Sequence, residues 1–220
     1  MINFNLLNLL RKKPSYISRT DMLQEALLGP ASYLTKVGWV NSINEHMPVD
    51  KDGEPLPWYT YPFIEFINQR INSSMRIFEY GSGNSTLWWS ERVASLVACE
   101  HEEDWFENIS KKIPATVNYI HCKLEYGGAY CKLISSFTSE FDCIIIDGRD
   151  RVNCAMNAIG ALKENGIIIW DNSDRESYQD GYSFLLSNGF KRIDFWGIGP
   201  INTYSWCTSI FYRETNCLGI

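Results

Sequence analysis

From residue 76 onward, short apolar runs alternate with segments whose apolar residues recur at helical spacing. The apolar runs predict strands at 76–80, 95–100, 117–122, 141–146 and 166–170, with helices between them. Uninterrupted aliphatic runs such as Ile144-Ile145-Ile146 are typical of strands that helices cover on both faces. Because strands joined through helices require right-handed crossovers, we expect a doubly wound α/β sheet with helices on both faces.

Two further strands are predicted at 191–196 and 207–212. About ten residues, which include Gly197, Gly199 and Pro200, join them and leave little room for a crossover helix. We therefore expect a mostly parallel, seven-stranded sheet that ends in an antiparallel C-terminal strand pair.

The first 60 residues differ from the rest of the chain. They contain a predicted helix at 19–28 and a polar, turn-rich piece at 50–55, and the regular alternation begins only after them. We divide the chain into an N-terminal helical extension, residues 1–60, and a domain, residues 61–220. The extension is predicted to act as a lid.

Composition excludes several classes of protein. The 20 basic and 26 acidic residues give a net charge of −6, which argues against a protein that binds nucleic acid. The seven cysteines are odd in number and lack a CxxC pair, which is typical of reduced cytoplasmic thiols. No stretch predicts a membrane span. We expect a cytoplasmic protein without a membrane partner, and an oligomer is compatible with the sequence.

A glycine-containing loop follows the first predicted strand. Gly81 and Gly83 allow a tight turn and close backbone approach to a ligand, and Ser82 lies between them. The helix that follows offers free N–H groups at its N-terminus. The second strand ends at Glu100, 19 residues after Gly81, where an acid can accept both hydroxyls of a ribose. The pattern predicts a nucleotide-type site.

The residues around this loop favour one nucleotide over another. A dinucleotide fingerprint requires a third glycine where Thr86 stands. Glu79, two residues before Gly81, would repel a pyrophosphate but attract a sulfonium and an amino group. The combination indicates S-adenosylmethionine (SAM) rather than NAD. A nicotinamide enzyme, or a glycine turn in an unrelated α/β protein, remains an alternative.

Four segments together resemble the class I SAM-dependent methyltransferases, over roughly residues 60–213. They are the loop FEYGSGNST, the acid Glu100, the fourth strand FDCIIIDG and the fifth strand NGIIIWDN. The resemblance implies that the glycine loop approaches the methionine half of SAM. It also implies that the acid of the first strand lies near the amino or sulfonium end, and that the acid after the second strand binds the ribose. The implied cofactor residues are Glu79, Gly81, Ser82, Gly83 and Glu100.

Two predicted strands end in acids that should face the same crevice. Asp147 follows the fourth strand, and Asp171-Asn172 follows the fifth. These groups either orient substrate or bind a hard cation such as Mg²⁺. The arrangement is similar to that of the metal-dependent O-methyltransferases, but Asp150 stands where that subfamily has a catalytic lysine. Mg²⁺ is therefore kept as one alternative, and metal ligands are not assigned.

Asp147, Asp171 and Asn172 are the predicted catalytic residues, with Asp171 as the candidate base or the anchor of one. His46 and His101 are alternative bases. The adenine contact should lie near residues 122–125, by the same resemblance.

A motif that the sequence lacks narrows the class of possible acceptors. Amine methyltransferases of nucleobases carry Asp/Asn-Pro-Pro-Tyr after the fourth strand, where this chain has Asp147-Gly148-Arg149-Asp150. Arg149, Arg151 and Arg175 either receive an acidic small molecule or pair with neighbouring acids. We expect methyl transfer from SAM to a small-molecule acceptor, at a hydroxyl oxygen. The alternatives are a non-catalytic SAM-binding or interaction module and an aminopropyltransferase.

Eight tryptophans are an unusual number for a chain of 220 residues. Trp39 and Trp58 lie in the extension, while Trp170 and Trp206 lie beside the predicted site. Several of them are expected to form an aromatic wall around a planar or apolar acceptor. Trp105 is instead assigned to ordinary packing.

Overall fold

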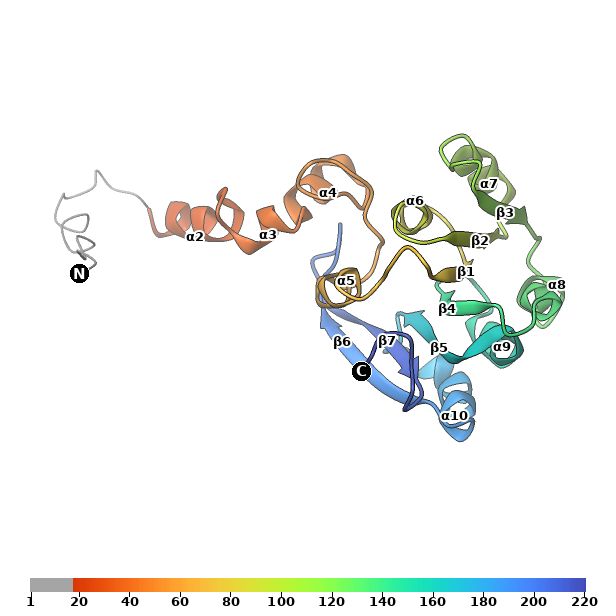
Figure 1. Ribbon diagram of the computed structural model, residues 1–220. Helices are drawn as coiled ribbons and strands as arrows, with labels where there is room; N and C mark the ends of the chain where they lie inside the picture. The colour runs from red at the N-terminus through yellow and green to blue at the C-terminus, as the bar shows by residue number, and fades with distance from the viewer. Residues whose placement is uncertain (1–17) are drawn as a thin grey trace.

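The computed structural model describes residues 18–220, and a seven-stranded sheet lies at its centre (Figure 1). The strand order is β3-β2-β1-β4-β5-β7-β6. Strands β1 to β5 are parallel, and β7 runs antiparallel between β5 and β6. The predicted doubly wound sheet with an antiparallel C-terminal pair is therefore confirmed. The strands are β1 Arg76–Tyr80, β2 Ser95–Glu100, β3 Val117–His121, β4 Phe141–Ile146, β5 Leu162–Asp171, β6 Lys191–Gly197 and β7 Trp206–Tyr212.

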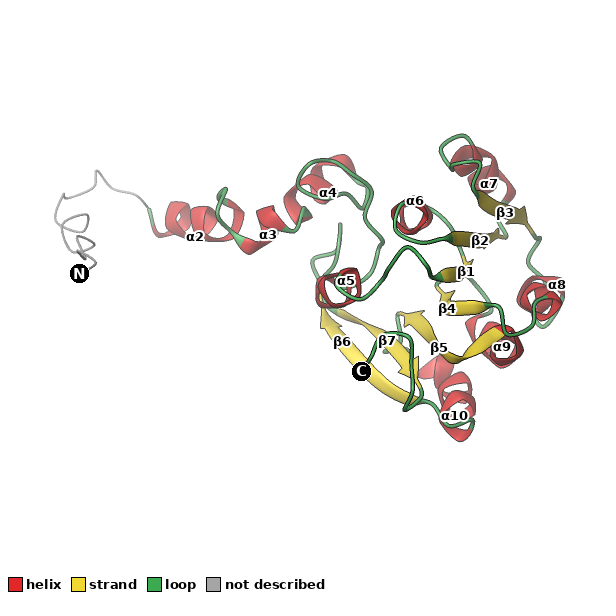
Figure 2. Cartoon of the chain, viewed as in Figure 1, coloured by secondary structure: helices red, strands yellow, loops and turns green. Residues whose placement is uncertain are grey.

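Helices surround this sheet, as Figure 2 shows. They are α2 Arg19–Leu28, α3 Tyr33–Lys36, α4 Trp39–Glu45, α5 Tyr61–Asn68, α6 Asn84–Ser90, α7 Glu103–Ser110, α8 Ala129–Lys132, α9 Arg151–Ala158 and α10 Gln179–Ser187. Short 3₁₀ helices occupy Leu133–Ser136, Ile159–Ala161 and Glu176–Tyr178.

Side chains on the two faces of the sheet belong to separate hydrophobic clusters. On β1, Ile77 packs with α5 and α6, whereas the next residue, Phe78, packs with α8 and α9. Successive side chains of a strand point to opposite faces, so an unbroken apolar run is buried on both. The strands of this chain contain aliphatic runs because both faces of the sheet are buried.

The edges of several elements differ from the sequence prediction. β5 begins at Leu162 rather than at residue 166, because a register shift against β4 lets an earlier residue pair. α5 begins at Tyr61, and Pro62 lies in its first turn, where a missing N–H costs nothing. Such differences leave the carboxyl ends of the strands where they were expected.

The described part of the N-terminal extension contains α2, α3 and α4, followed by a non-helical segment at residues 46–60. Ser18 caps α2 through a reciprocal capping box, and α2 buries none of its residues. In Figure 1, α2 and α3 extend away from the sheet. Residues 1–17 of the predicted extension lie outside the described residues. Within residues 18–220, no helix has the length and apolarity that a membrane crossing requires.

Candidate active site

Three adjoining cavities lie at the carboxyl ends of β1, β2, β4 and β5, and Asp147 lines all three. We name them by what lines them. The polar cavity, of about 490 Å³, contains Gly81, Ser82, Glu100, Trp105, Arg149 and Arg175 on its wall. The apolar cavity, of about 690 Å³, and the aromatic cavity, of about 350 Å³, open beside it. Open α/β sheets bind ligands at this edge.

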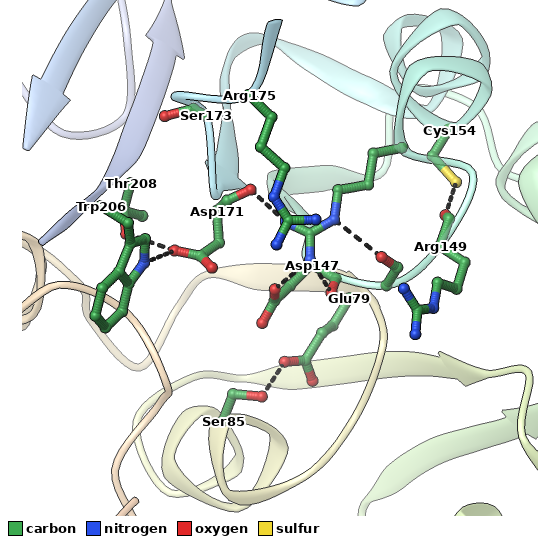
Figure 3. A network of polar contacts seen from close by, with 12 residues as sticks. Glu79, Ser85, Asp147, Arg149, Cys154, Asp171, Ser173, Arg175, Trp206 and Thr208 are labelled. Atoms are coloured by element: carbon green, nitrogen blue, oxygen red, sulfur yellow. Dashed lines mark hydrogen bonds and ion pairs between the residues drawn. The ribbon is translucent and has the colours of Figure 1, made fainter. Parts of the chain in front are cut away.

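The glycine loop is held from behind by Glu79. Its fully buried carboxylate accepts hydrogen bonds from the hydroxyls of Ser85 (2.5 Å) and Thr86 (2.6 Å), and Figure 3 shows the Ser85 contact. The backbone N–H of Gly83 donates to the Thr86 hydroxyl (3.1 Å). Gly81 has φ of 96°, which glycine adopts without strain. Burial raises the pKa of Glu79 to about 7, and the two hydroxyls oppose that rise.

Glu79 is therefore not on the wall of any of the three cavities. The resemblance implied that this acid lies near the amino or sulfonium end of the cofactor. In the structure its oxygens point into the first turn of α6 and fix the shape of the loop.

Glu100 lines the polar cavity and is nearly fully buried. One carboxylate oxygen accepts from the Ser82 hydroxyl at 2.7 Å. The other accepts from the backbone N–H groups of His101 (2.7 Å) and Glu102 (3.0 Å). These bonds hold the carboxylate in one orientation, as a group that binds vicinal hydroxyls must be held.

Trp105 belongs to the site, so its assignment to ordinary packing was wrong. Its indole N–H donates to the backbone oxygen of Ser82 at 2.9 Å, and the ring lines both the polar and the apolar cavity. The residue is 46% exposed. The sequence does contain a signal for this role. Trp105 lies in the first turn of α7, and α7 begins shortly after Glu100, at the edge of the sheet where the site lies.

A buried arginine joins the two predicted catalytic acids. Arg151 donates to the Asp147 carboxylate (3.0 Å) and backbone oxygen (2.7 Å), and also to the backbone oxygen of Asp171. One carboxylate oxygen of Asp171 accepts from Trp206 (2.9 Å) and Thr208 (2.6 Å), as Figure 3 shows. Burial raises the pKa of both acids, and the guanidinium of Arg151 opposes that rise.

These acids do not fit a divalent cation. The Asp147 carboxylate already faces the cation of Arg151, and one oxygen of Asp171 already takes two donors. A hard cation needs several oxygens that are free to bind it. Across residues 18–220, no three or more His, Cys, Asp or Glu residues are grouped so that they could hold a metal.

The remaining predicted residues divide into those near the site and those away from it. Asn172 lines both the polar and the aromatic cavity, and His101 lines the polar one. His46 lines the apolar cavity. Residues 122–125, where the adenine contact was expected, are not among the residues that line the polar cavity.

The aromatic wall is smaller than the tryptophan count implies. Trp58 and Trp206 line the aromatic cavity, and the Trp39 indole donates to the backbone oxygen of Asn202 (2.9 Å), also on that wall. Trp170 is instead fully buried in the core, against Tyr182. It therefore contributes packing.

Most of the described non-glycine residues with positive φ lie around the cavities. His46, Asn172 and Ile201 each line a cavity, and Asp150 lies between two lining arginines. Ser139 also has positive φ but lines none of the three. Asn, Asp and His adopt this conformation more readily than other residues, whereas it is strongly disfavoured for the β-branched Ile201.

No family profile and no curated protein matches the sequence. Solved structures do match the fold. A precorrin-6y C5,15-methyltransferase from Geobacter metallireducens has 10% identity and a TM-score of 0.58, with 78% of this chain and 96% of that chain covered. A methyltransferase-like protein from Silicibacter pomeroyi has 18% identity and a TM-score of 0.52, with 73% and 89% covered. A spermidine synthase in complex with the transition-state analogue AdoDATO has 15% identity and a TM-score of 0.51, with 70% and 57% covered.

These identities establish the fold alone. The chain has the Rossmann-like fold of the class I SAM-dependent methyltransferases, as the resemblance implied, and spermidine synthase shares that architecture.

Proposed function

We propose that this chain is a SAM-dependent methyltransferase that acts on a hydroxyl oxygen of a small molecule. One observation carries the proposal: the glycine loop, the Glu100 carboxylate and two free arginines share a cavity that meets a second, aromatic cavity at Asp147. The first cavity has the groups that SAM requires, and the second has room and acids for an acceptor.

The polar cavity offers partners for the carboxylate, the amino group and the ribose of SAM. Arg149 and Arg175 form no ion pair within the described chain, so both are available to the methionine carboxylate. One carboxylate oxygen of Asp147 accepts from Arg151, and the other can bind the amino group. Glu100 is placed to accept the ribose hydroxyls, and Trp105 offers a flat apolar surface beside it.

The aromatic cavity suits a planar acceptor that bears a hydroxyl. Trp58, Tyr204 and Trp206 line it, together with Asp171 and Asn172. Bound SAM supplies an electrophilic methyl group on its sulfonium. Trp206 and Thr208 both donate to one carboxylate oxygen of Asp171, and no other side chain within residues 18–220 donates to the second oxygen, so the second can accept the proton that the acceptor hydroxyl loses.

Two further features complete the proposal. Met47, Pro48 and Trp58 of the N-terminal extension line the cavities, which supports a role for residues 1–60 as a lid over the domain 61–220. All seven cysteines are free thiols, which supports a reducing, cytoplasmic location.

An aminopropyltransferase is the second candidate, because spermidine synthase shares the fold. That reaction uses decarboxylated SAM, which has no carboxylate for Arg149 and Arg175 to bind. The two arginines on the cavity wall therefore favour intact SAM. A non-catalytic SAM-binding module is distinguished from an enzyme by turnover.

The test is transfer of label from [methyl-³H]SAM to a small-molecule extract of cells, followed by mass spectrometry of the labelled product. We expect a labelled O-methyl product with the wild type and little with Asp171→Asn. The reaction is run with Mg²⁺ and with EDTA, and equal rates are expected. SAM binding without any labelled product would favour the non-catalytic module.

A further inference from the structure

The apolar cavity is the largest of the three, and the proposed partners of SAM at Glu100, Arg149 and Arg175 line the polar cavity and not this one. Its volume of about 690 Å³ falls in the range of small-molecule sites. Met47, Pro48, Trp58, Trp105, Ile109 and Ile201 form its apolar wall. These residues come from the extension, from α7 and from the loop before β7, so three separate parts of the chain build the cavity.

The residues that line this cavity lie beside both ends of α7. Trp105, in the first turn of α7, contacts the glycine loop, beside which the methyl group is proposed to be transferred. Lys111 and Lys112 directly follow the last residue of α7 and are exposed to solvent. Neither lysine forms a salt bridge with any described residue. Two unpaired ammonium groups beside an apolar wall complement an anion attached to an apolar body.

The backbone at Ile201 gives independent support. Ile201 is a β-branched residue with φ of 69°, a conformation that is strongly disfavoured for its type, and it lines the apolar cavity. A glycine at this position would remove the strain. The strained conformation instead keeps an apolar side chain on the wall, which is expected where that wall contacts a ligand.

We propose that the apolar cavity holds the body of the acceptor and that Lys111 and Lys112 bind an anionic group at its far end. The acceptor is then an anionic amphiphile, whose hydroxyl reaches past Asp147 to Asp171 in the aromatic cavity and whose carboxylate or phosphate lies at Lys111 and Lys112. This inference rests on the proposed function, which it extends by naming the class of acceptor.

The test uses four probes with the same ten-carbon chain: decanoate, decyl phosphate, decan-1-ol and decyltrimethylammonium. Each is titrated below its critical micelle concentration into the full chain, with and without S-adenosylhomocysteine, and binding is followed by calorimetry. We expect both anionic probes to bind saturably, and more tightly than the alcohol or the cation. Preference for the phosphate or for the carboxylate identifies the anion.

Three variants, one of them a control, test where the probes bind. Lys111→Gln/Lys112→Gln should lower the affinity for both anionic probes by about tenfold and leave the affinity for decan-1-ol unchanged, since only the charged contact is lost. Lys36→Gln/Lys132→Gln removes two exposed lysines elsewhere and should change nothing. Asn108→Trp adds bulk to the cavity wall and should weaken all the probes that bind.

Several outcomes would overturn the inference. They are equal binding of the cationic probe, full anion affinity in the Lys111→Gln/Lys112→Gln variant, or no binding of either anionic probe by wild type that binds S-adenosylhomocysteine. A wild type that fails to bind S-adenosylhomocysteine would instead refute the proposed function. The two failures are therefore distinguishable.

Discussion

Glu79→Gln removes a carboxyl group that is fully buried behind the glycine loop and replaces it with an amide of similar shape. Burial raises the pKa of this group from its ordinary value of 4.5 to about 7. Between these two pH values the folded chain binds more protons than the unfolded chain. The free energy of unfolding of the wild type therefore falls as pH rises through this window.

The structure sets the size of this effect. A rise from 4.5 to about 7 corresponds to roughly 3 kcal/mol, since each pKa unit is worth about 1.4 kcal/mol. Glutamine does not titrate, so the free energy of unfolding of Glu79→Gln does not show this fall with pH. Relative to the variant, the wild type should lose about 3 kcal/mol of stability between about pH 4 and pH 8.

Urea unfolding, followed by tryptophan fluorescence at several pH values, measures the difference directly. Other titrating groups are common to both proteins and largely cancel in the difference. Glu107→Gln, at an exposed position on α7, controls for the loss of one negative charge. A difference between wild type and Glu79→Gln that stays constant across this pH range would refute the reasoning about Glu79.

Four further predictions concern the ligand. A Cβ at Gly81 would lie 3.2 Å from the backbone nitrogen of Gly148, so Gly81→Val should abolish SAM binding in calorimetry, and retained binding would mean that the loop does not contact SAM. Glu100→Ala should weaken the binding of SAM by ~1–3 kcal/mol, and an unchanged affinity would place the ribose elsewhere. Arg175→Met should weaken SAM but leave decarboxylated SAM unaffected; equal losses for both would contradict the carboxylate contact. Asp171→Asn should keep the affinity for SAM while label transfer falls, and normal transfer would make Asp171 structural.

The sequence predicted the sheet and the edge at which the site lies, for one physical reason. In a parallel sheet the residues that follow each strand meet at the same edge, so Gly81, Glu100, Asp147 and Asp171 could be grouped from strand positions alone. Their spacing along the chain carried no information about which side chains pair there.

The contacts within the site could not be predicted in this way. Glu79 turns toward hydroxyls of the helix that follows the loop, because a buried carboxylate requires hydrogen-bond donors. Arg151 reaches two neighbouring strands, although the sequence shows only its i,i+4 spacing from Asp147. Trp105 looked like a packing residue because a helical position alone does not reveal which neighbour the ring meets.

Calorimetric titration of the wild type with SAM, decarboxylated SAM and NAD⁺ tests the central claim most directly. We expect saturable binding of one SAM per chain, weaker binding of decarboxylated SAM and no binding of NAD⁺. Binding of NAD⁺, or no heat with SAM at protein concentrations well above micromolar, would contradict the account.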